Sequence, residues 1–293
     1  MIRHEGTLYR PPSEAGSLIL QATIGCSYNE CSFCGMYRAK RFRVRPLGEL
    51  EAEIEWAGAH LGARVRKVFL ADGDALVAKA SFLAAVLERL RSTFPELRRV
   101  SCYASPQALQ VRTVDEMVRL RELGLSLYYL GIESGHDEVL RRLVKGVDAA
   151  EMVRVAHKAH EAGVALSTMI LLGAGGHELS AEHARASARV LNAIQPRFVS
   201  TLEMTPVPDT PLHAEAQRGE YHPLTDHQAT HELRELLAGL DLRATIFRSN
   251  HASNAVPLAG TLSRDKARLL AALDELLALG DEAPFVPPWM RGL

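Results

Sequence analysis

Residues 17–34 read SLILQATIGCSYNECSFC, an apolar run followed directly by a loop with three of the four cysteines in this 293-residue chain. The apolar run at 17–24 predicts a β-strand, because short β-branched and aliphatic runs are typical of buried strands. Cys26, Cys31 and Cys34 then fall within nine residues. This clustering indicates metal or redox chemistry in a reducing compartment and does not resemble a disulfide framework.

Outward from this stretch, short apolar segments alternate with amphipathic helical segments. Capping-box pairs, Thr113 with Glu116 and Asp148 with Glu151, mark the starts of two of the helices. Six strand–helix units of about 31 residues match the size of a βαβ repeat. Their strands are apolar on both faces, which indicates a parallel sheet covered by helices. The further strands are predicted at 67–71, 99–104, 125–133, 164–173 and 197–204.

The sequence therefore predicts an α/β fold, a partial (β/α)6 TIM-like barrel, because six units fall short of the eight in a closed barrel. We expect a single domain over residues 1–293, with a core at about 17–204 and a C-terminal helical and strand extension at about 205–293. A flat doubly wound sheet is the rival architecture, but no GxGxxG fingerprint follows the first strand. In both architectures the loops at the carboxyl ends of the strands hold the functional groups.

Composition narrows the class of protein. The net charge is −1 and the pI is about 6.9, which does not favour a general nucleic-acid binder. The N-terminal sequence lacks the apolar core of a signal peptide, and no segment approaches 18 uninterrupted apolar residues. We expect a cytoplasmic protein that does not associate with a membrane.

Three close thiolates restrict the metal. Soft thiolate ligands select zinc, copper(I) or iron–sulfur clusters. A structural zinc site closes four ligands, and a [4Fe–4S] cluster normally takes four cysteines. With three, one iron would keep an open position for substrate chemistry. A zinc-stabilised scaffold or a non-catalytic iron–sulfur electron carrier stays open as an alternative at this point.

Residues 17 to about 210 resemble the radical S-adenosylmethionine (SAM) superfamily. The final CSFC, with Phe33 in the aromatic slot, matches the superfamily motif, although this chain has C-x4-C-x2-C where C-x3-C-x2-C is usual. The segment GIESG is similar to the branch that includes coproporphyrinogen dehydrogenase, the methylthiotransferases and the elongator Elp3 proteins. The resemblance implies that Cys26, Cys31 and Cys34 hold a [4Fe–4S] cluster whose unique iron binds SAM.

The same resemblance implies a set of cofactor contacts in other loops. The turn after the second strand would meet the amino group of SAM, the end of the fourth strand would lie beside SAM, and the glycine-rich loop after the fifth would pass the adenine. Glycine lets backbone approach a ligand, and a carboxylate suits an ammonium group. The expected cofactor-binding residues are Phe33, Asp72, Gly73, Asp74, Glu133, Gly173 and Gly175.

The implied activity is reductive cleavage of SAM to a 5′-deoxyadenosyl radical, which abstracts hydrogen from an unidentified substrate. A small molecule or peptide is expected, with an electron donor such as flavodoxin or ferredoxin. An RNA-modifying member is a further alternative, because a basic run, RAKRFRVR at 38–45, follows the cysteines. Cys102, Tyr103 and His251 are weak candidates for catalysis, each with a structural role as the competing interpretation.

Overall fold

The computed structural model describes residues 1–292. Its main sheet has eight strands in the order β1-β4-β5-β6-β7-β8-β9-β10 and is mostly parallel, with β10 antiparallel to β9. The remaining two strands form an antiparallel hairpin. The strands are β1 (Leu18–Leu20), β2 (Thr23–Ile24), β3 (Arg43–Val44), β4 (Lys67–Leu70), β5 (Arg99–Tyr103), β6 (Leu125–Glu133), β7 (Ala165–Leu172), β8 (Phe198–Glu203), β9 (Thr245–Arg248) and β10 (Ala259–Leu262).

Helices separate most of the strands, which confirms the predicted α/β class. They are α1 (Leu47–Leu61), α2 (Ala80–Thr93), α3 (Pro106–Val111), α4 (Val114–Glu122), α5 (Asp137–Arg142), α6 (Ala149–Glu161), α7 (Gly176–Ile194), α8 (Pro211–Gln217), α9 (Asp226–Gly239) and α10 (Lys266–Ala278). The chain divides into two compact units. The first comprises residues 1–29, 36–130 and 155–166, and the second comprises 30–35, 131–154 and the chain from 167 onward.

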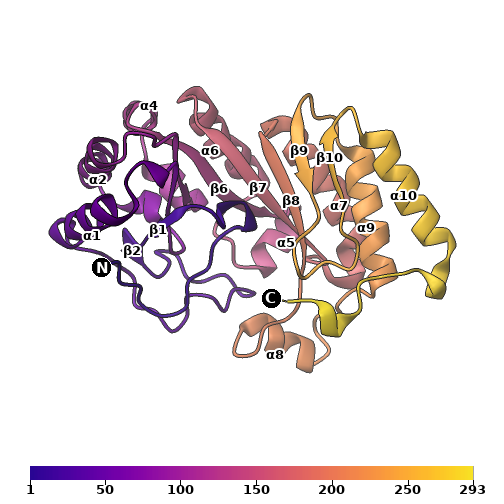
Figure 1. Cartoon of the computed structure of the whole chain (residues 1–293). Coiled ribbons are helices and arrows are strands. Elements are labelled where there is room, and N and C mark those ends of the chain that lie inside the picture. The colour runs from indigo at the N-terminus through magenta and orange to yellow at the C-terminus, as the bar shows by residue number, and fades with distance from the viewer. Residues whose placement is uncertain (293) are drawn as a thin grey trace. The chain divides into compact units, whose positions relative to one another are not determined.

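In the first unit, helices cover one face of the strands. α1 and α2 pack against each other, and α2 also contacts α4 (Figure 1). The apolar stripe of α2 is fully buried, as its spacing of three and four residues requires. On the other face, Phe69, Tyr103 and Tyr129 form an edge-to-face cluster with ring centroids 5.2 to 5.9 Å apart.

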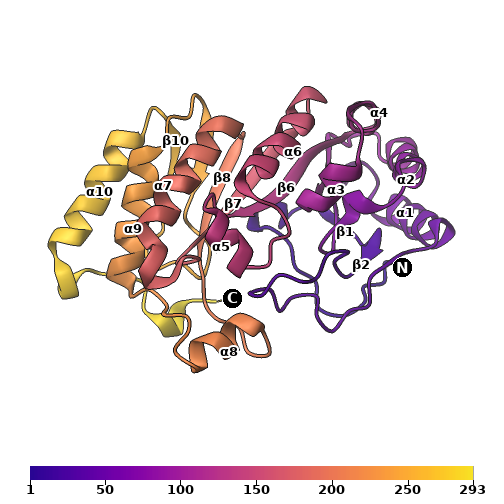
Figure 2. The ribbon, with the colours of Figure 1, turned by 180° about the vertical axis from the view of Figure 1, so that it is seen from behind.

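In the second unit, α7, α9 and α10 lie side by side along the strands β7 to β10 (Figure 1), and the reverse view shows the same order (Figure 2). α9 begins at a capping box, in which the Thr225 hydroxyl accepts from the Gln228 N–H and the Gln228 side chain accepts from the Thr225 N–H. α7 is the longest helix of the described chain and begins at Gly176.

Two details differ from the expected elements. The strand predicted at 17–24 is two strands, because the chain leaves the main sheet after Leu20 to form the hairpin. β9 is the strand expected in the extension, and it continues the parallel sheet. β10 was missed, since its sequence AGTL has little of the β-branched and aromatic character that favours strands.

Candidate active site

The cysteine loop, residues 25–42, connects β2 to β3. The hairpin pairs Thr23 with Val44 and Ile24 with Arg43, so both ends of the loop are held together at its base. All three cysteines of the loop are partly exposed. Gly25 precedes the first of them with φ +78°, a left-handed conformation that favours glycine.

The segment between Cys26 and Cys31 contains a left-handed residue. Asn29 has φ +49°, a conformation that asparagine tolerates better than most residues. Its side-chain amide donates a hydrogen bond to the carbonyl oxygen of Tyr37 at 3.2 Å. This residue lies in the part of the motif where the chain has four residues between two cysteines.

The other half of the motif is anchored in the second unit. The Ser32 N–H donates to Leu143 O at 2.9 Å, its hydroxyl donates to Arg142 O at 3.0 Å, and Ser32 O accepts from Leu212 N–H at 3.0 Å. Phe33 packs against the buried side chains of Val139 and Leu143. The residues between Cys31 and Cys34 are therefore fixed, and the predicted aromatic slot is filled by a side chain within an apolar cluster.

The turn after β4 lies against the first cysteine. A Cβ at Gly73 would stand 2.6 Å from Cys26 Cβ and 2.8 Å from Tyr37 Cε2, so only glycine fits there. The Gly73 N–H donates to Gly25 O at 3.0 Å. Asp72 and Asp74 are both fully buried. The predicted turn and the first predicted cluster ligand are therefore in direct contact.

The two carboxylates of this turn bind protein groups. Asp72 accepts from Gly25 N–H and from Lys40. Asp74 accepts from the Ser105 hydroxyl at 2.6 Å and from the Ser27 hydroxyl at 2.5 Å. Burial raises the pKa of Asp74, while the hydrogen bonds from the two serines lower it. A ligand ammonium at this turn would therefore meet main-chain carbonyl groups more readily than either carboxylate.

Glu133 ends β6 in a left-handed conformation with φ +65°. Its carboxylate accepts a hydrogen bond from Lys145 at 3.0 Å, and both side chains are nearly buried. A Cβ at Gly131 would stand 1.9 Å from Glu133 Oε1, so this glycine lets the carboxylate fold back along the strand. Lys145 was not predicted, because nothing in the local pattern distinguishes it from a surface lysine.

The glycine-rich loop after β7 is hydrogen-bonded to α9. The Gly173 N–H donates to Glu232 at 2.6 Å, and Gly173 O accepts from the Tyr221 hydroxyl at 2.8 Å. Gly173 has φ +83° and requires glycine. At Gly175 the backbone is ordinary, but a Cβ would stand 2.9 Å from Leu179 O. Both predicted glycines are thus explained by local geometry.

Two buried titratable residues connect these loops. The His183 ring lies 2.8 Å from the Ser134 hydroxyl through Nδ1 and 3.6 Å from Glu232 through Nε2. Burial lowers the pKa of His183 to about 4 and raises the pKa of Glu232 to about 7. Ser134 follows Glu133 directly, and Glu232 binds Gly173. The network therefore joins the ends of β6 and β7, and sequence reasoning missed both of its titratable members.

The weak catalytic candidates on β5 lie on opposite faces. Tyr103 belongs to the aromatic cluster with Phe69 and Tyr129. Cys102, its neighbour, therefore points to the helix-covered face, and it is fully buried. Burial raises the pKa of the Cys102 thiol far above its usual range. This placement favours the core role for Cys102.

His251 lies in a turn after β9. Its Nδ1 is 2.9 Å from the Ser253 hydroxyl, and burial lowers its pKa. Asn254 organises the turn: its Oδ1 accepts from Glu203 N–H, and its amide donates to Thr201 O and to the Ser249 hydroxyl. Hydrogen bonds within the turn account for most of these polar groups, which favours the structural interpretation of this segment.

The basic run after the cysteines is largely neutralised. Lys40 pairs with Asp72. Arg43 forms an exposed pair with Glu5, and Arg45 forms a buried pair with Glu53 at 2.9 Å. Three of the five cations thus have carboxylate partners within the first unit. The run does not present the continuous basic surface that an RNA-binding function would require.

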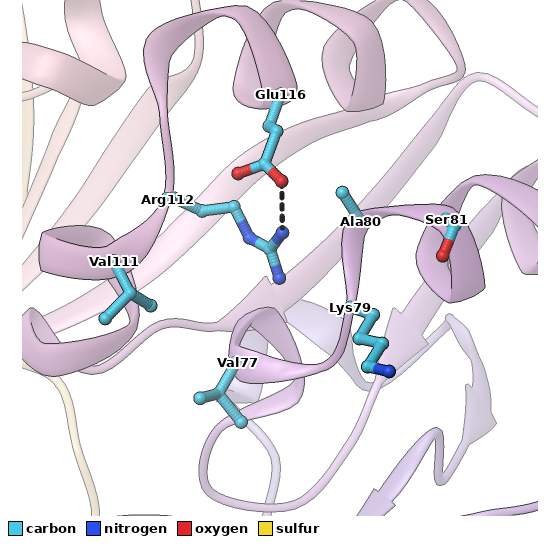
Figure 3. A pocket seen from close by; sticks show the side chains of 7 residues that line it. All are labelled: Val77, Lys79, Ala80, Ser81, Val111, Arg112 and Glu116. Carbon is cyan, nitrogen blue, oxygen red and sulfur yellow. Dashed lines mark ion pairs between the residues drawn. The ribbon is translucent and has the colours of Figure 1, made fainter.

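A hollow of about 440 Å³ lies elsewhere in the first unit, where α2 begins (Figure 3). Arg112 occupies it, pairing with Glu116 at 3.3 Å and donating to Leu76 O. The hollow contains none of the predicted site residues. It is lined by Val77, Lys79, Ala80, Ser81, Val111, Arg112 and Glu116.

No group of three or more histidine, cysteine, aspartate or glutamate side chains is arranged to hold a metal ion within residues 1–292. No helix in that part of the chain is long and apolar enough to cross a membrane.

The main sheet is mostly parallel, and three thiols lie in the loop between β2 and β3. The radical SAM superfamily model matches residues 20–185, more than half of the chain, so this protein belongs to the radical SAM superfamily. It is an enzyme of that class, with a [4Fe–4S] cluster and SAM as its cofactors.

Comparisons with individual proteins show more distant similarity. An uncharacterized protein of Methanocaldococcus jannaschii is 23% identical over 46% of this chain and 42% of its own length. Coproporphyrinogen III oxidase from Escherichia coli, whose description calls it a radical SAM enzyme, aligns with a TM-score of 0.58 and 18% identity, over 76% of this chain and 51% of that one. Methylornithine synthase aligns with a TM-score of 0.53 and 18% identity, over 78% and 64%. The two structural likenesses confirm the partial TIM-like fold. The chain spans less than two thirds of the length of each of the three proteins.

Proposed function

We propose that this enzyme cleaves SAM reductively and uses the 5′-deoxyadenosyl radical to abstract a hydrogen atom from a small-molecule or peptide substrate. The observation that carries the proposal is the group of three partly exposed thiols in one loop, with no fourth cysteine in that loop. When bound, a [4Fe–4S] cluster supplies one electron to SAM at the iron that no cysteine holds.

The residues present fit the cluster by the chemistry of their donors. Cys26, Cys31 and Cys34 would hold it, because thiolates are the ligands that iron–sulfur clusters take. The missing Cβ at Gly73 brings the main chain against Cys26. Ser32 has its main chain and hydroxyl engaged by three hydrogen bonds, which fixes the direction of the chain between the other two thiols.

We assign the SAM contacts to four segments. The amino group would bind at the turn Asp72, Gly73 and Asp74, where the buried carboxylates shape the turn. Glu133 would contact SAM from the end of β6, held in position by Lys145. The loop with Gly173 and Gly175 would admit the adenine, since Gly173 has a left-handed φ that favours glycine and a Cβ at Gly175 would stand 2.9 Å from Leu179 O. Phe33 would support that loop from the apolar cluster that includes Ala174.

Tyr103 faces the aromatic side of the sheet and His251 lies in the turn after β9, and both are candidates for substrate contact. The electron donor would be a flavodoxin or ferredoxin. The neutralised basic run disfavours an RNA substrate. A reducing cytoplasm would suit a thiol-held cluster.

The test uses the full chain, reconstituted with iron and sulfide without oxygen. The wild-type protein should be brown, bind about four irons by the cluster stoichiometry, and release 5′-deoxyadenosine from SAM in the presence of a reductant. Replacing Cys26, Cys31 or Cys34 by alanine should abolish the colour and the release, whereas C102A should keep both. Colourless protein with stoichiometric zinc and no SAM cleavage would instead identify a zinc-stabilised scaffold.

A further inference from the structure

Asp72 occupies an unusual backbone and side-chain environment. Its φ of +66° is left-handed, and its side chain is fully buried. The carboxylate accepts hydrogen bonds from Gly25 N–H at 2.8 Å, from Gln21 Nε2 at 3.1 Å, and from Lys40 Nζ at 2.9 and 3.0 Å. One backbone N–H and two side chains therefore converge on one carboxylate.

Lys40 is equally constrained. Its Nζ also donates to Thr7 O at 2.8 Å, and its side chain is 9% exposed. Gly6 makes room for it, because a Cβ at Gly6 would stand 2.9 Å from Lys40 Cε. The N-terminal segment thus encloses the ammonium group. A long side chain fixed in this way loses rotamer freedom, which its three hydrogen-bonding contacts offset.

The positions of these partners in the sequence give the pair its meaning. Gly25 immediately precedes Cys26, and Lys40 follows Cys34 by six residues. Asp72 therefore joins the two ends of the segment that contains all three thiols. Asp74 adds a second attachment, because its carboxylate accepts from the hydroxyl of Ser27, which follows Cys26. The first thiol is held on both sides by one turn.

The hairpin alone gives the loop weak support. β2 and β3 pair through only two residues each, and an isolated two-stranded ribbon is marginal in water. β3 is exposed. A buried ion pair is not by itself evidence of stability, but it can specify one arrangement over others. We propose that Lys40 and Asp72 are positioning residues that close the cysteine loop and hold Cys26 in place before any cluster is present.

The test compares K40M and D72N with the wild type and with R43Q. R43Q removes an exposed cation of β3, directly after the cysteine loop, that pairs with Glu5. Trypsin nicking of cluster-free protein at Arg38 or Arg41, both exposed, reports loop closure directly. Iron retention by reconstituted protein against a chelator reports the hold on the cluster. We expect K40M and D72N to be nicked, and to lose iron, at least about fivefold faster than the wild type. R43Q should match the wild type. K40R should keep most of the wild-type protection.

The inference about Lys40 and Asp72 rests on the proposed function only for the measurement of iron retention. The trypsin measurement is independent of it. The proposed role of Lys40 and Asp72 would be refuted if K40M protein were nicked and lost iron at the wild-type rate, with an unchanged melting temperature. K40M keeps the test decisive if D72N does not fold. In the double variant K40M/D72N, the rate of nicking should equal that of K40M or D72N alone, because all three variants lack the same interaction. If K40M were nicked faster than the wild type but the wild type took up no iron, the result would support the role of Lys40 and Asp72 and refute the proposed [4Fe–4S] cluster.

Discussion

The carboxylate of Glu133 and the ammonium group of Lys145 form a buried ion pair, with 3.0 Å between Oε1 and Nζ. Three backbone features serve this contact. Glu133 and Val144 are both left-handed, at φ +65° and +52°, and Gly131 provides the space that the carboxylate fills. A positive φ at a β-branched residue such as valine is a genuine outlier, and such strain concentrates at functional sites.

Removing Lys145 should therefore affect both stability and SAM binding. K145M leaves a buried carboxylate without its cation, which costs about 3–5 kcal/mol in the free energy of unfolding. The double variant E133Q/K145M removes both charges and should recover most of that loss, yet it should bind SAM as weakly as E133Q. Urea unfolding and equilibrium dialysis with labelled SAM check the two effects. Wild-type SAM affinity in E133Q/K145M would contradict the proposed role of Glu133.

Gly73 should tolerate no side chain. In G73A the new Cβ meets Cys26 Cβ and the Tyr37 ring inside 3.0 Å, so the cysteine loop or the turn must shift. We expect a loss of about 1–3 kcal/mol in the free energy of unfolding, typical of overpacking, together with a lower iron content after reconstitution. G48A is the matched control, because a Cβ at Gly48 in α1 meets nothing within 4 Å. Equal stability of the two variants would show that the turn is not packed as described.

His183 and Glu232 should give stability opposite dependences on pH. The raised pKa of Glu232, about 7, means that its contribution is present below its ordinary value of 4.5 and is lost as pH rises through 7. The lowered pKa of His183, about 4, means that its contribution is present above 6.5 and is lost as pH falls toward 4. In the wild type the two slopes largely cancel between pH 4.5 and 6.5.

Single variants should expose each slope. E232Q leaves His183, so its stability should rise from pH 4.5 to 6.5 by up to about 1.4 kcal/mol per pH unit relative to a protein lacking both groups. H183Q leaves Glu232, so its stability should fall over that interval. Glu203, whose pKa burial raises to about 7, contributes equally to all the proteins compared. Parallel pH profiles for the two variants, measured by urea unfolding at pH 4.5, 5.5 and 6.5, would rule out this pairing.

The turn after β9 offers a contrast between two neighbouring polar residues. N254A removes a buried side chain that makes hydrogen bonds to Thr201 O and Glu203 N–H, among others, and leaves those groups unsatisfied. It should lower the free energy of unfolding by about 1–3 kcal/mol. H251A should change stability little, and an unchanged KM and kcat would assign the whole turn to structure. A rise in KM for H251A, with N254A less stable as expected, would instead place His251 at the substrate.

Local patterns predicted the parallel core and the loops of the site. β6 was predicted with its observed bounds, because LSLYYLGIE is apolar, aromatic and ends before a turn. The thiols, the turn at Gly73 and the left-handed glycine at 173 were recognisable because their chemistry is contained in a few adjacent residues. The extension was predicted less well, since AGTL forms a strand only through its partner β9.

The contacts that support the site could not be predicted in this way. Lys40 and Asp72 are 32 residues apart, and Glu232 is 59 residues from Gly173. Each is an ordinary charged residue of a helix, turn or loop until packing buries it beside its partner. Sequence patterns report periodicity and local turn chemistry, whereas these contacts depend on which segments the sheet brings together.

The cysteine loop begins and ends in the β2–β3 hairpin, which is separate from the main sheet. The number of residues between the thiols therefore does not affect the strands of the main sheet. Because β2 and β3 pair outside the main sheet, an insertion between Cys26 and Cys31 shifts no strand and turns no core side chain outward. Lengthening a closed loop of this size by one residue costs less than about 0.1 kcal/mol in chain entropy. The strands of the main sheet therefore keep their register whatever the number of residues between the first two thiols, where the left-handed Asn29 lies.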